Sequence, residues 1–266
     1  MRKSSVAKAT PVPLAAVDGW PINIANEHDA IDAIVGAAGC GEGFAAFTLN
    51  LDHLVKLRRD PHFRYAYGRA KFVTADGAPV ARIAAFTNPR IVRTTGADLV
   101  VPLAAAAARA KIPVYLFGTT PEVLAKAGVD LATRIELALD TAGSLAPGRN
   151  FDPRGPEADA AIDQIVASGA RLCFVALGAP KQEIFAAYAV ERGAKVGFVC
   201  IGAALDFLAG AQVRAPGFMR NNGMEWLWRL ATNPRRLAGR YAQCALVLAD
   251  VVLIAPLRER LLQPRV

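Results

Sequence analysis

The stretch "RLCFVALGAPKQEIF" (Arg171–Phe185) joins an apolar run to a Gly-Ala-Pro turn and a helical pattern. The run Arg171–Ala176 predicts a strand buried on both faces, because a strand with one wet face would alternate apolar and polar residues. A helix is expected over Lys181–Arg192, after the turn. One short Ser, Asp or Asn would cap that helix better than Lys-Gln-Glu. The stretch therefore predicts a β-α unit whose corner carries long polar side chains that face a ligand.

The same alternation of apolar runs and helical patterns recurs along the chain. Short apolar strands separated by helices indicate an α/β fold, namely a mostly parallel Rossmann-like sheet with helices on both faces. The expected strands are Phe44–Leu49, Lys71–Ala75, Pro113–Phe117, Arg171–Ala176 and Lys195–Ile201. The expected helices are Leu51–Arg59, Ala97–Lys111, one from Pro121, Glu157–Ser168 and Lys181–Arg192.

Three parts of the chain are expected from composition. Residues 1–16 form a loose tail, residues 17–230 the α/β domain, and residues 231–266 a basic and apolar C-terminal helical appendage that associates with a membrane. Within the domain, Leu139–Pro156 is rich in Gly and Pro and is expected to be a loop. No internal repeat is present.

The formal net charge of +8 lies mainly at the two ends of the chain. Residues 1–10 carry +3 and residues 234–266 carry +4, which leaves about +1 for the body. A nucleic-acid-binding domain usually carries basic residues over a folded face or groove. The charge distribution therefore argues against a nucleic-acid partner.

The cysteines and histidines predict neither a metal site nor a disulfide. Cys40, Cys173, Cys200 and Cys244 lack metal or redox spacing, and no signal peptide is visible, which indicates a reducing, cytoplasmic setting. The three histidines, His28, His53 and His62, are expected at the surface. No Asp-x-Asp pair is present to hold a divalent cation.

In a parallel sheet of this kind, ligands bind beyond the carboxyl ends of the strands. That edge would gather Thr48, Asn50, Asp76, Gly118 and Gly178–Glu183. Asp76, in "TADGAP", is a candidate general base, although taken alone the Asp-Gly pair favours an ordinary turn or a helix cap. Thr48 and Asn50 serve equally well as helix caps or as ligand contacts.

Two further segments suggest anions and membranes. In "RTTGADL", Arg93 and the start of a helix would favour an anion. The C-terminal segment has a charge-free run of only Tyr241–Ala249, far short of the ~20 residues that span a bilayer. An apolar helix flanked by arginines fits the membrane interface, and a core or dimer helix is the alternative.

Taken in order, "TLN", "ADG", "RTTGADL", "LGAPKQE", "RAPGFMRNNGMEWLWRL" and "NPRRLAGRY" resemble the WecG/TagA/CpsF glycosyltransferase family over Val17–Tyr241. The resemblance implies an inverting enzyme that moves a sugar from a UDP-sugar to a polyprenyl-diphosphate-linked acceptor. The sugar would be of the N-acetylmannosamine, N-acetylmannosaminuronic acid or glucose type. No cofactor and no metal would be needed.

The resemblance also assigns roles to residues. Asp76 matches the catalytic base, and Gln182 would contact the donor or acceptor sugar in a pocket that includes Gly178. Glu183 would hold hydroxyls or orient its neighbours. The remaining candidates would bind substrate (Thr48, Asn50, Arg93 and Arg214) or would meet the lipid diphosphate and the membrane (Arg229, Arg235, Arg236 and Arg240). The enzyme would lie peripherally on the inner face of the cell membrane, with a homo-oligomer or a membrane-protein partner as further expectations.

Two other classes of protein are weighed against this one. A nicotinamide-dependent oxidoreductase would need the Gly-x-Gly-x-x-Gly fingerprint, which is absent. A non-catalytic membrane-surface scaffold would have no need for Asp76, Gln182 and Glu183 at the edge of the sheet. The tail after Tyr241 is longer and more apolar than the resemblance requires.

Overall fold

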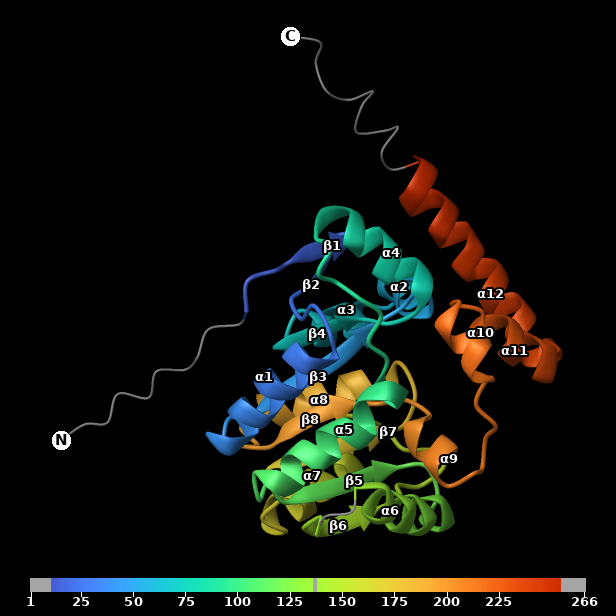
Figure 1. The fold of residues 1–266 in the computed structure, drawn as a ribbon. Helices are drawn as coiled ribbons and strands as arrows, with labels where there is room; N and C mark the ends of the chain where they lie inside the picture. The colour runs from blue at the N-terminus through green and yellow to red at the C-terminus, as the bar shows by residue number, and fades with distance from the viewer. Residues whose placement is uncertain (1–10, 136–137, 255–266) are drawn as a thin grey trace.

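A computed structural model describes residues 11–135 and 138–254 of the chain (Figure 1). Its centre is a six-stranded sheet in the order β4-β3-β8-β7-β5-β6, in which every neighbouring pair is parallel. The prediction of a parallel, Rossmann-like α/β sheet is confirmed. The strands are β3 (Phe44–Leu49), β4 (Phe72–Ala75), β5 (Val114–Gly118), β6 (Thr141–Leu145), β7 (Leu172–Ala176) and β8 (Gly197–Cys200).

Helices cover both faces of the sheet and bury a separate apolar layer against each. One face is covered by α2 (Leu51–Arg59), α3 (Pro61–Tyr67), α4 (Ala78–Thr87), α7 (Pro156–Ala167) and α8 (Lys181–Glu191). The other is covered by α1 (Glu27–Gly39), α5 (Gly96–Arg109), α6 (Pro121–Ile135) and the short α9 (Ala204–Leu208).

The sequence of β7 is continuously apolar because both of its faces are covered. Cys173 and Val175 of β7 belong to one apolar layer, and Leu172 and Phe174 to the other. Successive side chains of a strand point to opposite faces, so both sets of positions must be apolar when both faces are covered. Phe185 of α8 completes the first layer and stacks on Phe117, with ring centroids 4.5 Å apart.

Two parts of the fold differ from the sequence prediction. Leu139–Pro156 contains the edge strand β6, and its sequence "TAGSL" lacks an apolar run because Thr141 and Ser144 are exposed. At the N-terminus, β1 (Ala15–Val17) and β2 (Trp20–Ile22) form an antiparallel hairpin. Its Asp18-Gly19 turn has positive φ at both residues, the backbone that Asp-Gly favours in a two-residue hairpin. The strand β1 thus begins inside the segment 1–16 that was expected to be a tail.

The order of the strands places a topological switch point at the carboxyl ends of β3 and β8. The helix after β3, α2, covers one face of the sheet, whereas the helix after β8, α9, covers the other. The connections that follow these two neighbouring strands therefore lead to opposite faces of the sheet. In open parallel sheets, ligands bind at such a point.

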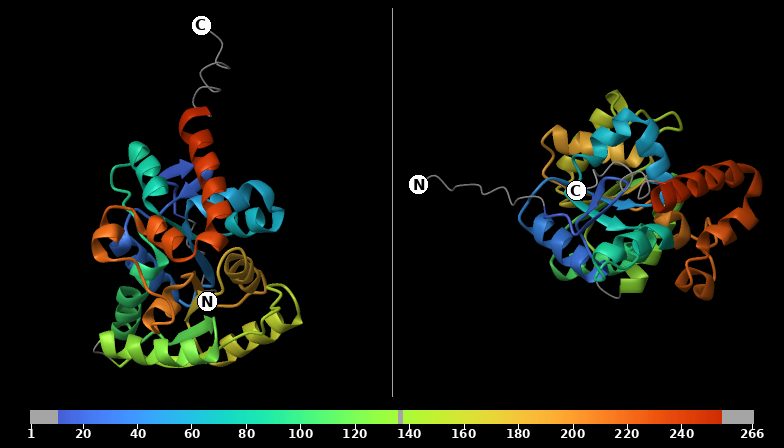
Figure 2. Two further views of the ribbon diagram at one scale, coloured as in Figure 1. Left: turned by 90° about the vertical axis from the view of Figure 1, so that its right-hand side faces the viewer. Right: turned by 90° about the horizontal axis from the view of Figure 1, so that it is seen from above.

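The C-terminal segment lies on one side of the molecule, and its long last helix packs along α2 (Figures 1 and 2). It contains α10 (Gly217–Asn221), α11 (Glu225–Thr232), α12 (Pro234–Ala249) and a π-helical turn, η1 (Asp250–Ile254). In α12, Leu237, Cys244 and Val247 are buried, whereas Leu246 is exposed.

Pro234–Ile254 forms a continuous 21-residue helix. By length and composition it is apolar enough to cross a membrane, although no membrane is present. The charge-free run Tyr241–Ala249 therefore underestimated the length of the helix. Asp250 ends that run, but the helix continues through it to Ile254.

Candidate active site

Asp76 and two polar residues from the neighbouring strand meet at the carboxyl edge of the sheet. The Asp76 Oδ2 atom accepts hydrogen bonds from Thr48 Oγ1 at 3.3 Å and from Asn50 Nδ2 at 3.2 Å. The Asp76 backbone N–H extends the β3–β4 pairing by donating to the Leu49 carbonyl at 2.8 Å. Strand pairing therefore holds the carboxylate in place, as expected from the convergence of strand ends.

Asn50 is a helix cap, one of the two functions that the sequence left open, and it also bonds to Asp76. Its Oδ1 atom accepts from the His53 N–H at 3.0 Å and so caps α2, while its Nδ2 atom holds Asp76. Asp76 itself caps no helix, because the N-cap of α4 is Gly77, with φ of 77° and no side-chain cap. The interpretation of Asp76 as a helix cap is therefore wrong. Its carboxylate bonds to Thr48 and Asn50 rather than to the backbone of α4.

The surroundings of Asp76 favour its protonated form relative to an exposed carboxylate. Burial raises its pKa, and the Asn50 hydrogen bond opposes this rise. The negative charge of Glu225 raises the pKa further, whereas Arg229 and Arg93 lower it. A carboxylate with a raised pKa is a stronger base, which suits a group that must take a proton from a hydroxyl.

The segment leading into α11 closes over this carboxylate. Gly223, with φ of +73°, precedes α11, and a Cβ atom there would lie 2.4 Å from the Ala78 Cβ atom. Only glycine permits this approach to the start of α4, two residues beyond Asp76. Glu225 and Arg229 are thereby carried to the Asp76 side of the sheet, which explains their effect on its pKa.

Three candidate arginines gather beside Asp76 around Asp98 and Phe207. Arg214 pairs with Asp98 at 2.5 Å, and Arg93 pairs with the same carboxylate at 3.4 Å. Burial tends to raise the pKa of Asp98, but Arg214, Thr95 and Arg93 lower it below its ordinary value. The guanidiniums of Arg214 and Arg229 lie 5.9 and 5.4 Å from the centre of the Phe207 ring. The cluster could bind an anionic group next to Asp76.

In the Lys-Gln-Glu corner, the Gln182 and Glu183 side chains form hydrogen bonds within the protein. The Gln182 Oε1 atom accepts from the Gly202 N–H at 3.1 Å, and its Nε2 atom donates to Glu183 Oε1 at 2.7 Å. Gln182 is 4% exposed and Glu183 is fully buried. Gly178 forms the preceding turn with φ of 75°, and its carbonyl accepts from the Gln182 N–H. The corner thus ties α8 to the turn after β8.

His53 is a site residue that the sequence analysis missed. It was expected at the surface, yet it is 4% exposed, whereas His28 and His62 are exposed as expected. Its Nδ1 atom lies 2.6 Å from the Tyr67 hydroxyl, and its Nε2 atom lies 3.8 Å from Glu183 Oε1. The signal was its spacing from Leu57, because residues four apart share one face of a helix and Leu57 is a core residue.

The remaining candidate arginines lie away from Asp76. Arg240 of α12 pairs with Asp52 of α2 at 3.3 Å. Arg235 and Arg236 are exposed, and within the described ranges neither forms an ion pair. These three residues therefore belong to the appendage surface and its contact with α2, not to the arginine cluster beside Asp76.

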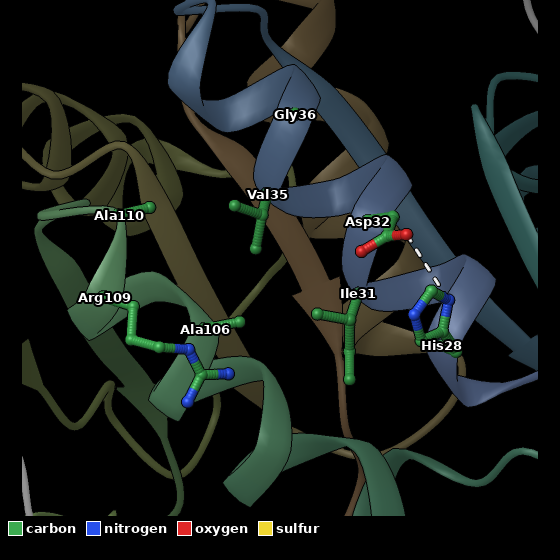
Figure 3. A pocket seen from close by; sticks show the side chains of 8 residues that line it. All are labelled: His28, Ile31, Asp32, Val35, Gly36, Ala106, Arg109 and Ala110. Atoms are coloured by element: carbon green, nitrogen blue, oxygen red, sulfur yellow. Dashed lines mark ion pairs between the residues drawn. The ribbon is translucent and has the colours of Figure 1, made fainter.

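An open groove of about 660 Å³ lies elsewhere, between α1 and α5 (Figure 3). Ile31 and Val35 form its apolar part, Arg109 lies on one side, and the His28–Asp32 pair, at 3.4 Å, lies on the other. None of the candidate site residues lines it. The residue set around Asp76, rather than this groove, is therefore the candidate active site. In the part of the chain that the structure describes, no three His, Cys, Asp or Glu side chains are grouped to hold a metal ion.

The fold and the residues at its carboxyl edge define an α/β domain with a half-buried carboxylate, an arginine cluster and an apolar C-terminal helix. The chain matches the model of the glycosyl transferase WecG/TagA/CpsF family over residues 15–262, nearly its whole length. It belongs to that family, and is a glycosyltransferase of cell-surface polysaccharide synthesis. The match extends beyond Val17–Tyr241 at both ends and includes the apolar helix. The family match excludes the oxidoreductase alternative.

Proposed function

We propose that this glycosyltransferase transfers a sugar from a UDP-sugar to a polyprenyl-diphosphate-linked saccharide, with inversion at the anomeric carbon. Asp76 takes the proton of the acceptor hydroxyl while the hydroxyl oxygen bonds to the anomeric carbon. The bond from that carbon to the diphosphate oxygen breaks, and UDP leaves with the electron pair. One displacement inverts the configuration.

The arrangement of Asp76 carries this proposal. Its carboxylate is fixed by Thr48 and Asn50, has a raised pKa and lies near enough to Arg229 and Arg93 for their charges to act on that pKa. A base and an anion-binding cluster side by side are what a displacement with a diphosphate leaving group requires. Arg93, Arg214 and Arg229 supply the positive charge for UDP, so no metal ion is part of the proposal.

The appendage brings the site to its lipid-linked acceptor. The helix Pro234–Ile254 exposes Leu246, Val252 and Leu253, while Arg235 and Arg236 are exposed near its start. Exposed apolar side chains next to arginines favour the interface of an anionic membrane. We place the protein at the cytoplasmic face of the cell membrane. A second copy of the chain or a membrane protein is a further partner in this proposal. Gln182 and Glu183 support the pocket that binds the sugar.

The test is UDP release in detergent micelles from a panel of UDP-sugars, with a polyprenyl-diphosphate-linked sugar as acceptor. The panel contains N-acetylmannosamine, N-acetylmannosaminuronic acid and glucose donors. We expect acceptor-dependent release with one donor. The Asp76→Asn variant should lose about 10²–10⁴-fold in kcat, the usual contribution of a general base, while still binding UDP.

The Asp130→Asn variant serves as the control, because Asp130 lies on α6 and pairs only with Arg134 among the described residues. It should match the unmodified enzyme. Full activity in Asp76→Asn would remove Asp76 from the role of base. A protein that binds no UDP would rule out the donor class.

A further inference from the structure

A line of buried polar groups runs beneath the candidate active site, from the turn after β8 to the end of β3. It begins at the Gly202 N–H and passes through Gln182 to Glu183. It then crosses to His53 and ends with the Tyr67 hydroxyl at the Thr48 carbonyl. Because each of these groups has few protons to donate, the position of one proton determines the positions of the others.

The direction is set at the Thr48 end. The β3–β8 pairing ends at Ala46 and Val199, so the Thr48 carbonyl lies beyond it and accepts from the Tyr67 hydroxyl at 3.3 Å. A tyrosine hydroxyl has one hydrogen. If that hydrogen bonds Thr48, then the contact of 2.6 Å between Tyr67 and His53 Nδ1 requires the proton on Nδ1.

The direction then fixes the other end of the line. A neutral imidazole with its proton on Nδ1 has an unshared electron pair on Nε2. That atom lies 3.8 Å from the fully buried Glu183 carboxyl, whose Oε2 atom has no hydrogen-bond partner. An ionised carboxylate would turn negative oxygens toward this electron pair and leave its charge buried, which is costly.

The geometry assigns a proton to the Glu183 carboxyl and a second to His53 Nδ1, so that both residues are neutral and act together as positioning residues. In this arrangement the Glu183 hydroxyl is the donor closest to His53 Nε2, across a 3.8 Å gap that is longer than a hydrogen bond. The hydrogen bonds on both sides of this gap run from Gly202 toward Thr48. Loss of the Glu183 proton reverses only the part of the line beyond Glu183, since the Gly202 N–H and the Gln182 amide still donate toward the carboxylate. The proton of His53 then moves to Nε2, and the Tyr67 hydroxyl turns from Thr48 toward Nδ1.

Burial acts in the same direction on both residues. It raises the pKa of Glu183 to about 7 and lowers that of His53 to about 3, which keeps both neutral in slightly acid solution. The hydrogen bond from Gln182 opposes the rise at Glu183. The other charged or titratable groups facing the pair are Asp52 and Lys56 on α2, Tyr67 on α3, Cys200 on β8 and Arg240 on α12.

The line connects to the proposed chemistry through Thr48, whose hydroxyl donates to Asp76. At its other end, Gln182 holds the turn after β8, the strand next to β3. The pair therefore positions the ends of these two neighbouring strands relative to each other. Only this last step rests on the proposed sugar transfer, because the positions of the protons do not depend on any reaction.

The first experiment measures the tautomer of His53 by ¹⁵N NMR of the full-length protein in detergent, with labelled histidine. The chain has only three histidines, and the His28→Asn and His62→Asn variants assign the signals. At pH 6 we expect Nδ1 to carry the proton and Nε2 to be bare. Above pH 7 the signals should exchange roles. A proton on Nε2 at pH 6, or an imidazolium there, would overturn the proposal.

Glu183→Gln provides the second variant, because its amide can donate to His53 Nε2 and accept from Gln182 but cannot titrate. We expect it to keep the Nδ1–H tautomer at all pH values. In the transfer assay its kcat should lose the decline above about pH 7 that the unmodified enzyme shows, because the amide cannot ionise. Glu191→Gln, at the exposed end of the same helix, should change neither property.

The outcomes separate this inference from the proposed function. A tautomer switch that is absent in Glu183→Gln supports the inference even if no transfer is found. A pH-dependent tautomer that is the same in Glu183→Gln and in the unmodified protein overturns it even if transfer is confirmed. If Glu183→Gln does not fold, the tautomer of the unmodified protein at pH 6 decides.

Discussion

At the scale of single residues, Glu183 links pH to the free energy of unfolding. Its pKa is about 7 in the folded protein and 4.5 when exposed, so the folded state retains a proton that the unfolded state has lost. This contribution to stability is complete below about pH 4.5 and is lost as pH rises through about 7. His53 acts oppositely, because its pKa falls from 6.5 to about 3, and its contribution increases as pH rises over that range.

Comparison with Glu183→Gln isolates the Glu183 contribution, because His53 remains in both proteins. From pH 4.5 to pH 8 the variant should gain about 3 kcal/mol of unfolding free energy relative to the unmodified protein, at 1.36 kcal/mol for each unit of pKa shift. Urea unfolding at a series of pH values measures this. Parallel curves for the two proteins would show that Glu183 is ionised in the folded state.

The sequence could predict which residues meet at the edge of the sheet, but not which hydrogen bonds and ion pairs they form there. Thr48 lies near the end of β3, Asn50 and Asp76 directly follow β3 and β4, and parallel strands bring their carboxyl ends together, so this meeting was predictable. His53 and Asp98 were missed as site residues because their partners, Glu183 and Arg214, are more than 100 residues away in sequence. Only tertiary packing could reveal those pairs.

At the scale of elements, α2 joins the candidate site to the appendage. Its first turn carries Asn50 and His53, which face the site, while Asp52 on another side pairs with Arg240 of α12. Near its end, Arg58 makes two bonds of 2.8 Å to Asp18 in the β1–β2 turn and one of 2.8 Å to Asp250. Seating of α12 and the position of α2 are therefore coupled through direct contacts.

Replacing Arg58 tests whether these contacts hold α12 against α2. Arg58→Ala removes charge-assisted bonds to two half-buried carboxylates, and we expect about 1–3 kcal/mol less docking free energy for α12. Hydrogen exchange of the α12 amides should then accelerate by about 5- to 150-fold, which is the same range expressed as a ratio. Arg134→Ala, which breaks an exposed pair within α6, is the control. Equal exchange in the two variants would show that Arg58 does not hold α12.

Elements were predictable where their sequence pattern is strong. The strands β3, β5, β7 and β8 are buried on both faces and have continuous apolar runs. The edge strand β6 pairs on one side only, needs fewer apolar residues and therefore looks like a loop. The Asp18-Gly19 pair is a recognisable signal for a two-residue hairpin turn. The strands beside it were not predicted, because three residues are too few to show an alternation of apolar and polar positions.

At the scale of the whole molecule, positive charge and exposed apolar surface coincide at the C-terminal helix. The body of the chain has a net charge of only about +1, whereas residues 234–266 carry +4. Binding to an anionic membrane should thus depend on a few arginines rather than on the overall charge of +8. Screening by salt should weaken it, since the Debye length is ~10 Å at 0.1 M.

The Arg235→Ala/Arg236→Ala variant tests this prediction. Each basic residue near an anionic surface contributes about 1 kcal/mol, so the double variant should bind phosphatidylglycerol vesicles about 30-fold more weakly at low salt. Neither side chain is paired within the described residues, so folding and UDP binding should be unchanged. Arg109→Ala/Arg149→Ala removes the same charge from exposed positions outside the appendage and should bind normally. Equal loss in both variants would mean that total charge, and not the appendage, directs the protein to the membrane.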